Sequence, residues 1–197
     1  MADRYRCFMD LAAERTEGLH YKILFTPRAS NVLVMAPHGG GIEPGTSDIA
    51  RSIAGNLYSI YCFEGIQSSD NYEDLHITSE NFDEPVAQGA LSRARWVLAV
   101  HGYRERLSAF VMVGGLHRGV KSRMERFLMD AGFNVRAPGA GFTGSSRRNL
   151  CNRGISRQGC QLEISKGLRD GLLESTRQLD SFAYAAREAL RTASGRL

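Results

Sequence analysis

Two histidines and a glutamate stand where short apolar segments give way to glycine. His38 follows the segment NVLVMAP and precedes three glycines, and Glu43 comes just before the helix-like stretch GTSDIARSIA. His101 ends the apolar segment WVLAV and is followed by Gly102. Imidazole nitrogens and carboxylate oxygens are common zinc ligands, and three protein ligands leave one position open for water. The pattern favours a catalytic zinc site held by His38, Glu43 and His101.

The glycine-rich loop also allows a simpler interpretation. Three glycines give the backbone the freedom to make a tight turn, or an anion-binding nest at the start of a helix. A phosphate-binding loop of the GxxxxGK[ST] type is disfavoured because no lysine follows these glycines. A histidine at the end of a strand is, taken alone, more often structural. Two such histidines with one glutamate are better explained by a shared site.

Glu163 interrupts the short apolar segment CQLEIS. Side chains alternate along a strand, so Glu163 lies on the opposite face from Leu162 and Ile164. An exposed glutamate on an edge strand would fit this pattern equally well. Beside a zinc site, however, Glu163 is the natural general base that takes the proton from the attacking water.

The elements that must position these residues alternate along the chain. Apolar runs bounded by turn residues predict strands, which are Tyr21–Phe25, Val32–Ala36, Leu57–Phe63, Trp96–His101, Phe110–Val113 and Gln161–Ile164. Helical spacing of apolar residues predicts helices, which include Ile49, Ile53 and Leu57 after Gly45, then Val120 to Gly132, and Leu179 to Leu190. We expect a three-layer α/β fold with a mixed or mostly parallel central sheet and helices on both faces. Sites in such folds gather at the carboxyl ends of strands.

Length and composition describe an ordinary globular protein. The 197 residues can bury one core, so we expect a single catalytic domain over residues 1–197. No segment approaches the roughly 20 apolar residues of a membrane span, and the charged N-terminal stretch does not resemble a signal peptide. The four cysteines lack paired spacing and are read as reduced thiols. We therefore expect synthesis in the cytoplasm. The net charge of +4 favours an anionic partner.

The segments PHGGGIEPGTSDIA, AVHGY and GCQLEIS, in this order, resemble the phage and bacterial poly-γ-glutamate hydrolases. The resemblance extends roughly from Lys22 to the last helix, and that family is distantly similar to the zinc carboxypeptidases. It implies a carboxypeptidase-like fold, one zinc ion per chain at His38, Glu43 and His101, and Glu163 as the catalytic residue. The carboxypeptidases space the first pair as HxxE, whereas this chain has HxxxxE, a longer spacing that the nearer family keeps.

The resemblance also implies a substrate. The family cleaves γ-glutamyl amide bonds of an anionic polymer, and the similar carboxypeptidases hold a substrate carboxylate with an Asn-Arg pair. Asn152 and Arg153, in the basic loop before the segment CQLEIS, match that pair and could bind a carboxylate through paired hydrogen bonds. The alternative for this loop is a solvated basic surface. A phage-type enzyme would reach an extracellular polymer through host lysis.

Two other functions compete with this one. A zinc amidase or deacylase of the same chemistry would act on a cell-wall peptide, an N-acyl amino acid or a γ-glutamyl metabolite. A basic nucleic-acid-binding protein would use the same arginines on phosphates. The second function is disfavoured because residues 145–158 contain no aromatic side chain among the basic ones.

The three other histidines are left out of the expected ligand set. His76 precedes a helix whose start is predicted near Pro85, and we expect it to be structural or to support the ligands. His117 and His20 have no identifiable partner.

Overall fold

Seven strands form one sheet in the computed structural model, which describes residues 3–191. They are β1 (Tyr21–Thr26), β2 (Val32–Gly40), β3 (Ser59–Gly65), β4 (Trp96–Tyr103), β5 (Val111–Gly114), β6 (Val135–Arg136) and β7 (Cys160–Ser165). Their order across the sheet is β1-β3-β2-β4-β7-β5-β6. The four central strands β3, β2, β4 and β7 are parallel, while β1 and β5 run antiparallel to their neighbours β3 and β7. The predicted mixed sheet is confirmed.

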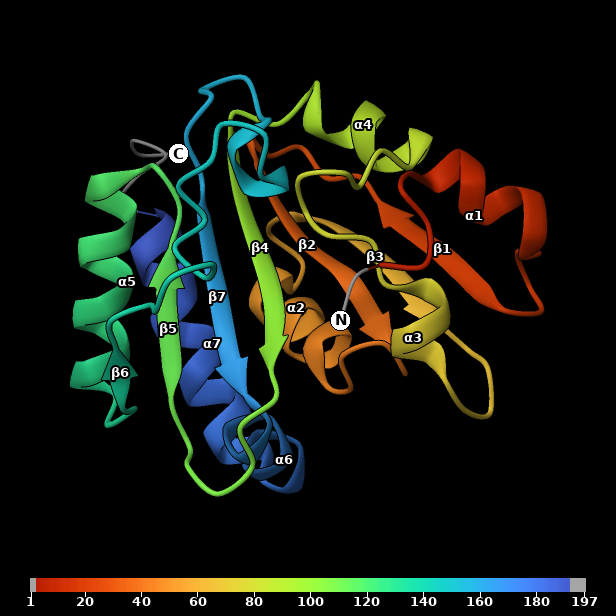
Figure 1. Cartoon of the computed structure of the whole chain (residues 1–197). Helices are drawn as coiled ribbons and strands as arrows, with labels where there is room; N and C mark the ends of the chain where they lie inside the picture. Colours follow the sequence, from red (N-terminus) through yellow and green to blue (C-terminus); the bar gives the residue numbers. More distant parts are fainter. Residues whose placement is uncertain (1–2, 192–197) are drawn as a thin grey trace.

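Helices cover both faces of this sheet (Figure 1). They are α1 (Phe8–Glu14), α2 (Thr46–Ala54), α3 (Asn71–Leu75), α4 (Pro85–Leu91), α5 (Arg118–Asp130), α6 (Lys166–Glu174) and α7 (Thr176–Arg191), with a 3-10 turn η1 (Leu150–Asn152). One core lies between the sheet and α2, α5, α6 and α7. The other core lies under α1, α3, α4 and η1. The predicted three-layer α/β architecture is therefore confirmed.

Strand β2 shows why the sheet must be covered twice. Val32, Val34 and Ala36 belong to one core, and the intervening Leu33 and Met35 belong to the other. Side chains of a strand alternate between faces, so a run that is apolar at every position requires both faces to be buried. This strand therefore lies in the interior of the sheet, and the loop after it emerges at the carboxyl edge.

The helices begin and end largely where the sequence predicts. Helix α5 ends before Gly132, which has a positive φ of 87° and so fits the usual glycine after a helix end. Helix α4 begins at Pro85, and Glu84 caps it. Leu57 was predicted to extend the helix after Gly45 and to begin the next strand. This prediction is wrong, because α2 ends at Ala54 before a positive-φ glycine, and Leu57 lies exposed in the turn.

The parallel strands bring their carboxyl ends to one edge of the sheet. Strands β2 and β4 are adjacent, and so are β4 and β7. His38 lies near the end of β2, His101 near the end of β4, and Glu163 near the end of β7. No helix among residues 3–191 is long and apolar enough to cross a membrane. The ends of the predicted 1–197 domain, residues 1–2 and 192–197, lie outside the described residues.

Candidate active site

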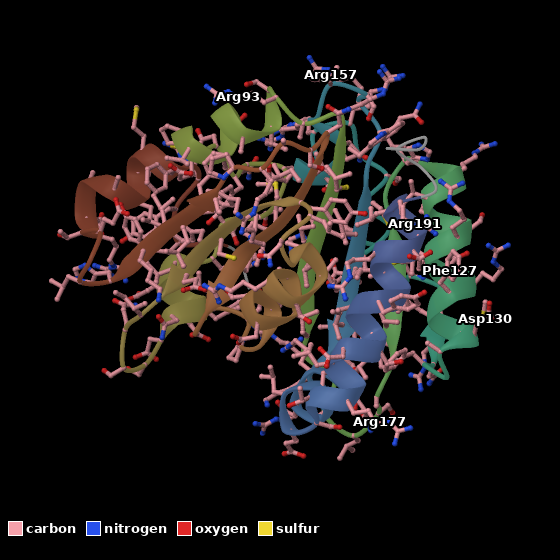
Figure 2. All side chains as sticks on the ribbon, turned by 180° about the vertical axis from the view of Figure 1, so that it is seen from behind. Arg93, Phe127, Asp130, Arg157, Arg177 and Arg191 are labelled. Carbon is pink, nitrogen blue, oxygen red and sulfur yellow. The ribbon has the colours of Figure 1, made fainter. Side chains whose placement is uncertain are left out.

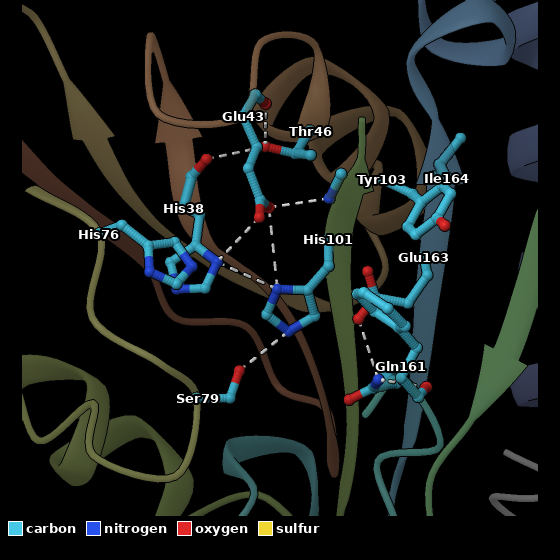
Figure 3. A network of polar contacts seen from close by, with 12 residues as sticks. His38, Glu43, Thr46, His76, Ser79, His101, Tyr103, Gln161, Glu163 and Ile164 are labelled. Atoms are coloured by element: carbon cyan, nitrogen blue, oxygen red, sulfur yellow. Dashed lines mark hydrogen bonds and ion pairs between the residues drawn. The ribbon is translucent and has the colours of Figure 1, made fainter. Parts of the chain in front are cut away.

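His38, Glu43 and His101 converge at the carboxyl edge of the sheet (Figure 3). The Nδ1 atoms of His38 and His101 are 3.2 Å apart. Glu43 places one carboxylate oxygen 3.3 Å from Nδ1 of His38 and the other 3.8 Å from Nδ1 of His101. All three side chains are buried. The two Nδ1 atoms and the Glu43 carboxylate therefore face one another at distances of 3.2–3.8 Å.

These spacings fit a metal centre. Ligand atoms bound tetrahedrally at about 2.0–2.1 Å from one ion lie about 3.3–3.4 Å from each other. The Nε2 atom of His38 lies 2.9 Å from the carbonyl oxygen of Ile77. A carbonyl only accepts, so Nε2 carries a proton, and in the neutral imidazole Nδ1 then has its lone pair available for a metal. On the far side of the other imidazole, Nε2 of His101 lies 3.1 Å from the Ser79 hydroxyl.

The loop between β2 and α2 holds Glu43 in place. The Glu43 backbone amide donates to the carbonyl of His38, and its carboxylate accepts a 2.8 Å bond from the amide of Gly102. Gly40 lies in the left-handed region with φ of 59°, and a Cβ there would come within 2.3 Å of the Gly65 carbonyl oxygen. Glycine is therefore required at this turn. The five-residue separation between His38 and Glu43 is spanned by a tight, internally bonded loop.

The charges in this cluster are strongly coupled. Burial by itself raises the pKa of Glu43, but the charge on His38 and the hydrogen bonds from His101 and His38 outweigh it and hold that pKa far below its ordinary value. Burial lowers the pKa of His38, but the Glu43 carboxylate overcomes this effect and raises it. Burial lowers the pKa of His101. A metal ligand must be deprotonated, so an ion bound here would displace the proton that the Glu43 carboxylate stabilises on His38.

His76 also lies at this centre. Its ring stacks at 4.2 Å from the His38 ring and at 4.6 Å from the Tyr72 ring. Nδ1 of His76 bonds to the Asp3 carboxylate at 2.7 Å. Burial, and then the charge on His38, lowers the pKa of His76 to about 4. His38 and Glu43 thus belong to two overlapping sets of possible ligands, one completed by His101 and the other by His76.

Glu163 lies beside His101 on the adjacent strand. The two residues are register partners of the parallel pair β4 and β7, and both line the same cleft. Glu163 accepts a 3.0 Å bond from the amide nitrogen of Gln161, whose oxygen accepts from Asn149. Burial raises the pKa of Glu163 well above its ordinary value, and the nearby Glu43 charge adds to this rise. Strand alternation could have found Gln161, which lies two residues before Glu163 and so on the same face.

The cleft around these residues has a volume of about 1230 Å³. Most small-ligand sites measure roughly 300–1,000 Å³, so the cleft has room for a longer substrate. Its basic lining residues come from two places, the segment after β4 and helix α6, and are Arg104, Arg106, Lys166 and Arg169. Acidic lining residues outside the central cluster are Glu73, Glu80 and Glu105.

The predicted pair Asn152 and Arg153 is not among the residues that line this cleft. The buried Asn152 amide bonds to four backbone groups, those of Leu116, Gly144, Ser146 and Gly159. Arg153 donates to the carbonyls of Ser79, Glu80, Phe82 and Arg148. Both residues thus use their hydrogen-bonding groups to hold loops, and Arg153 supports the segment that carries Ser79.

Part of the basic loop around this pair lies at the other end of the strands, whereas Asn149 of the same loop lines the cleft. Arg157, three residues before β7 begins, lies at the end of the sheet away from the carboxyl edge, together with Arg93 (Figure 2). Sequence reasoning weighted this loop because it concentrates arginine. The basic residues that do line the cleft follow β4 or belong to α6.

Comparisons with known proteins support the fold. The SPbeta prophage-derived UPF0714 protein YoqZ of Bacillus subtilis (strain 168) is 40% identical over 166 residues, which are 83% of this chain and 59% of that protein. The chain thus spans less than two thirds of the length of that relative. A bacteriophage poly-γ-glutamate hydrolase structure matches with a TM-score of 0.94 and 29% identity, covering 98% of this chain and 99% of that chain. A zinc-free apo structure of YNDL matches with a TM-score of 0.89 and 32% identity, with the same coverage of 98% and 99%.

The family assignment rests on nearly the whole chain. The model of the poly-γ-glutamate hydrolase family matches residues 5–189, which include every residue of the central cluster. The segments that carried the resemblance in the sequence are those that form the strand ends of the site. The chain belongs to the poly-γ-glutamate hydrolase family.

Proposed function

We propose that this protein is a zinc-dependent hydrolase that cleaves γ-glutamyl amide bonds, above all those of poly-γ-glutamate. His38, Glu43 and His101 would hold one zinc ion per chain, and Glu163 would act as the general base. The observation that carries the proposal is the convergence of three possible ligand side chains, with contacts of 3.2–3.8 Å between their polar atoms, beside a buried glutamate on the adjacent strand. The zinc-free form of the similar YNDL structure supports zinc as the metal.

The chain's own residues divide the chemistry among them. A zinc ion at this centre supplies Lewis-acid chemistry, because it polarises a carbonyl and makes water more acidic. Glu163 takes a proton from the attacking water and later gives it to the leaving amine. Gln161 holds the Glu163 carboxylate through the 3.0 Å bond, so the base is oriented before substrate arrives. The Glu163 side chain is buried, which limits its contact with bulk water.

The cleft favours an anionic polymer over a small amide. Its volume of about 1230 Å³ extends beyond the metal cluster, and Arg104 and Arg106 line it from the segment after β4. Poly-γ-glutamate carries one free carboxylate per residue, so basic side chains along the cleft would attract the chain and fix its register. The family match supports the same substrate.

The test joins metal content to cleavage. Purified wild-type protein, His38→Ala and the control His20→Ala are analysed for metal by mass spectrometry and incubated with poly-γ-glutamate, whose length is followed by size-exclusion chromatography. We expect about one zinc per chain and polymer shortening for the wild type and for His20→Ala, whose imidazole accepts a bond from the Thr16 amide away from the cluster. His38→Ala should lose both properties.

A second pair of variants decides between the overlapping ligand sets. His101→Ala should lose the metal, whereas His76→Ala should retain most of it, because Asp3 already holds the His76 ring. The reverse result would replace His101 by His76 in the ligand set. Zinc binding without polymer cleavage would redirect the search to smaller γ-glutamyl or peptide amides. A wild type that binds no zinc and gains no activity from added zinc would reject the proposal.

A further inference from the structure

Arg169 is a buried arginine in the first turns of α6, and it lies directly after the strand that carries Glu163. Its guanidinium donates to three backbone carbonyls. Nε bonds to Pro44 at 2.7 Å, and Nη1 bonds to both Tyr103, at 3.2 Å, and Ile164. Its relative exposure is 3%. Burying a charge costs free energy unless the charged group is hydrogen-bonded, and these three bonds offset that cost for Arg169.

The three carbonyls belong to the three segments of the proposed site. Pro44 follows Glu43 in the loop after β2, and Ile164 follows Glu163 in β7. Tyr103 ends β4, two residues after His101. These segments are far apart in sequence. The sheet hydrogen bonds connect neighbouring strands, and the Arg169 side chain adds a bond to each of the three segments. One planar guanidinium thus ties the backbone beside each of these functional residues to the others.

Gly102 leaves the space that this guanidinium fills. A Cβ at position 102 would lie 2.4 Å from Nη1 of Arg169 and 2.7 Å from its Cζ. Real Cβ atoms essentially never approach other atoms so closely, so a side chain at 102 and the guanidinium in its present place exclude each other. The same Gly102 donates its amide to the Glu43 carboxylate. Gly102 therefore packs against Arg169 and also hydrogen-bonds Glu43, so it links the two side chains.

Lysine could not replace this arrangement. Arginine presents five N–H donors in a fixed planar fork, whereas an ammonium group is a compact point charge. Two nitrogens of the planar Arg169 guanidinium, Nε and Nη1, donate to the three carbonyl oxygens. The remaining terminal nitrogen, Nη2, makes no hydrogen bond to another residue among 3–191, and Arg169 is one of the residues lining the cleft.

We propose that Arg169 is a positioning residue that fixes the distances between Glu43, His101 and Glu163 by clamping the three segments that carry them. This inference rests on the proposed function, because it assigns Arg169 a part in building that site. Losing the clamp should weaken metal binding and lower kcat, since the ligands and the base would lose their mutual geometry. Groups that support metal ligands from outside typically change metal affinity by roughly 10–100-fold.

The experiment measures zinc affinity by competition with a chromophoric chelator, together with kcat and KM on poly-γ-glutamate. The variants are Arg169→Ala and Arg169→Lys. The matched control is Arg187→Ala, which removes another arginine that donates to a backbone carbonyl, that of Ser52, but between α7 and α2. We expect roughly 10–100-fold weaker zinc binding and a lower kcat for both Arg169 variants, and no such change for the control. Added guanidinium chloride should restore part of both properties in Arg169→Ala but not in Arg169→Lys.

Gly102→Ala provides a test that keeps every polar group of the wild type. Its added methyl should displace the guanidinium and reproduce the loss of zinc affinity, whereas Gly89→Ala, at a glycine with open space around it, should not. In the double variant Gly102→Ala/Arg169→Ala the methyl has no guanidinium to displace. The double variant should therefore lose less zinc affinity than the two single losses combined, and the loss that the methyl still causes comes from its 2.9 Å contact with Cβ of Glu43. Such non-additivity is expected of residues in contact.

The outcomes separate this inference from the proposed function. A wild type without zinc binding or cleavage rejects the proposed function. A wild type that binds zinc and cleaves polymer, with Arg169→Ala unchanged in both, rejects the positioning role alone. If Arg169→Ala does not fold, as judged by circular dichroism, the Gly102→Ala result decides, and full zinc affinity in that variant would overturn the role. Additive effects in the double variant would overturn it as well.

Discussion

Glu84 and Glu163 are two buried glutamates with opposite surroundings. Glu84 caps the start of α4 and accepts three hydrogen bonds, from the Tyr61 hydroxyl and from the amides of Val86 and Ala87. Glu163 lies near the end of β7 and accepts one hydrogen bond from a described residue, the Gln161 side chain. Their relative exposures are 1% and 8%. Both carboxylates are buried, yet Glu84 accepts three hydrogen bonds from described residues and Glu163 accepts one.

The difference distinguishes a structural carboxylate, Glu84, from the carboxylate that we propose as the general base, Glu163. A carboxylate offers about four acceptor sites, and a buried acceptor without partners costs free energy. Glu84 recovers this cost by capping a helix and holding Tyr61. Glu163 leaves acceptor capacity facing a cleft, next to Glu43, and its raised pKa records the cost. A buried carboxylate with few hydrogen bonds lowers the stability of the folded protein, and such groups are typical of functional sites.

The largest expected effect is on catalysis. Glu163→Gln keeps the shape of the side chain and its bond from Gln161 but cannot accept a proton, so kcat on poly-γ-glutamate should fall roughly 10²–10⁴-fold. Zinc content should stay near that of the wild type. Steady-state cleavage measured with metal analysis checks both points. A variant that keeps more than half of the wild-type kcat would exclude Glu163 as the base.

Glu84→Ala should show the reverse pattern. The change removes the cap of α4 and leaves the Tyr61 hydroxyl without its partner, so the free energy of unfolding should fall by about 2–4 kcal/mol. Urea denaturation followed by circular dichroism measures this change. The folded variant should retain wild-type kcat, because Glu84 does not line the cleft. Loss of kcat without loss of stability would remove the distinction between the two carboxylates.

Glu163→Gln should also stabilise the metal-free protein at neutral pH. The raised pKa means that folded Glu163 releases its proton less readily than in the unfolded chain, so wild-type stability falls as pH rises above the ordinary carboxyl pKa. Below that pKa both states hold the proton and the penalty disappears. The thermal midpoint of the variant should therefore exceed that of the wild type near pH 7, and the gap should close near pH 4. Each kcal/mol corresponds to about 2–4 °C in a chain of this size. Calorimetry in the presence of a chelator gives the two curves, and a gap that widens toward acid pH would contradict the assignment.

The sequence located the central cluster because its signals are local. His38 and His101 each follow an apolar strand, and adjacent parallel strands bring such ends together. Glu163 was found in the same way, as a polar residue inside a strand. Helix boundaries such as Pro85 were equally readable, whereas Leu57 was misplaced because an apolar residue after a glycine fits both a helix and a strand.

The supporting residues could not be found because their partners are distant in sequence. Arg153 was expected to bind substrate, yet its carbonyl partners include Ser79 and Phe82, more than seventy residues away. Arg169 was not singled out in the sequence, and its contact with Pro44 spans 125 positions. A cluster of arginines in the sequence does not show where their side chains point, because the direction of each guanidinium depends on tertiary packing. The predicted substrate role of Asn152 and Arg153 therefore stays a prediction that their placement does not favour.

The smallest expected effect concerns substrate capture, and it extends the contrast between the two ends of the sheet. Arg104 lines the cleft and lies 4.1 Å over the Tyr72 ring, whereas Arg93 lies exposed at the other end of the strands (Figure 2). Exposed charge pairs are worth about 0.2–1 kcal/mol, so Arg104→Gln should raise KM for poly-γ-glutamate roughly 1.5- to 5-fold with little change in kcat. Salt screens such charges, so the wild-type KM should rise with ionic strength, and that rise should be shallower in Arg104→Gln. Arg93→Gln, with the same change in net charge, should leave KM and its salt dependence as in the wild type. Equal effects of the two variants would mean that the overall charge of +4 attracts the polymer and that the cleft adds no local recognition.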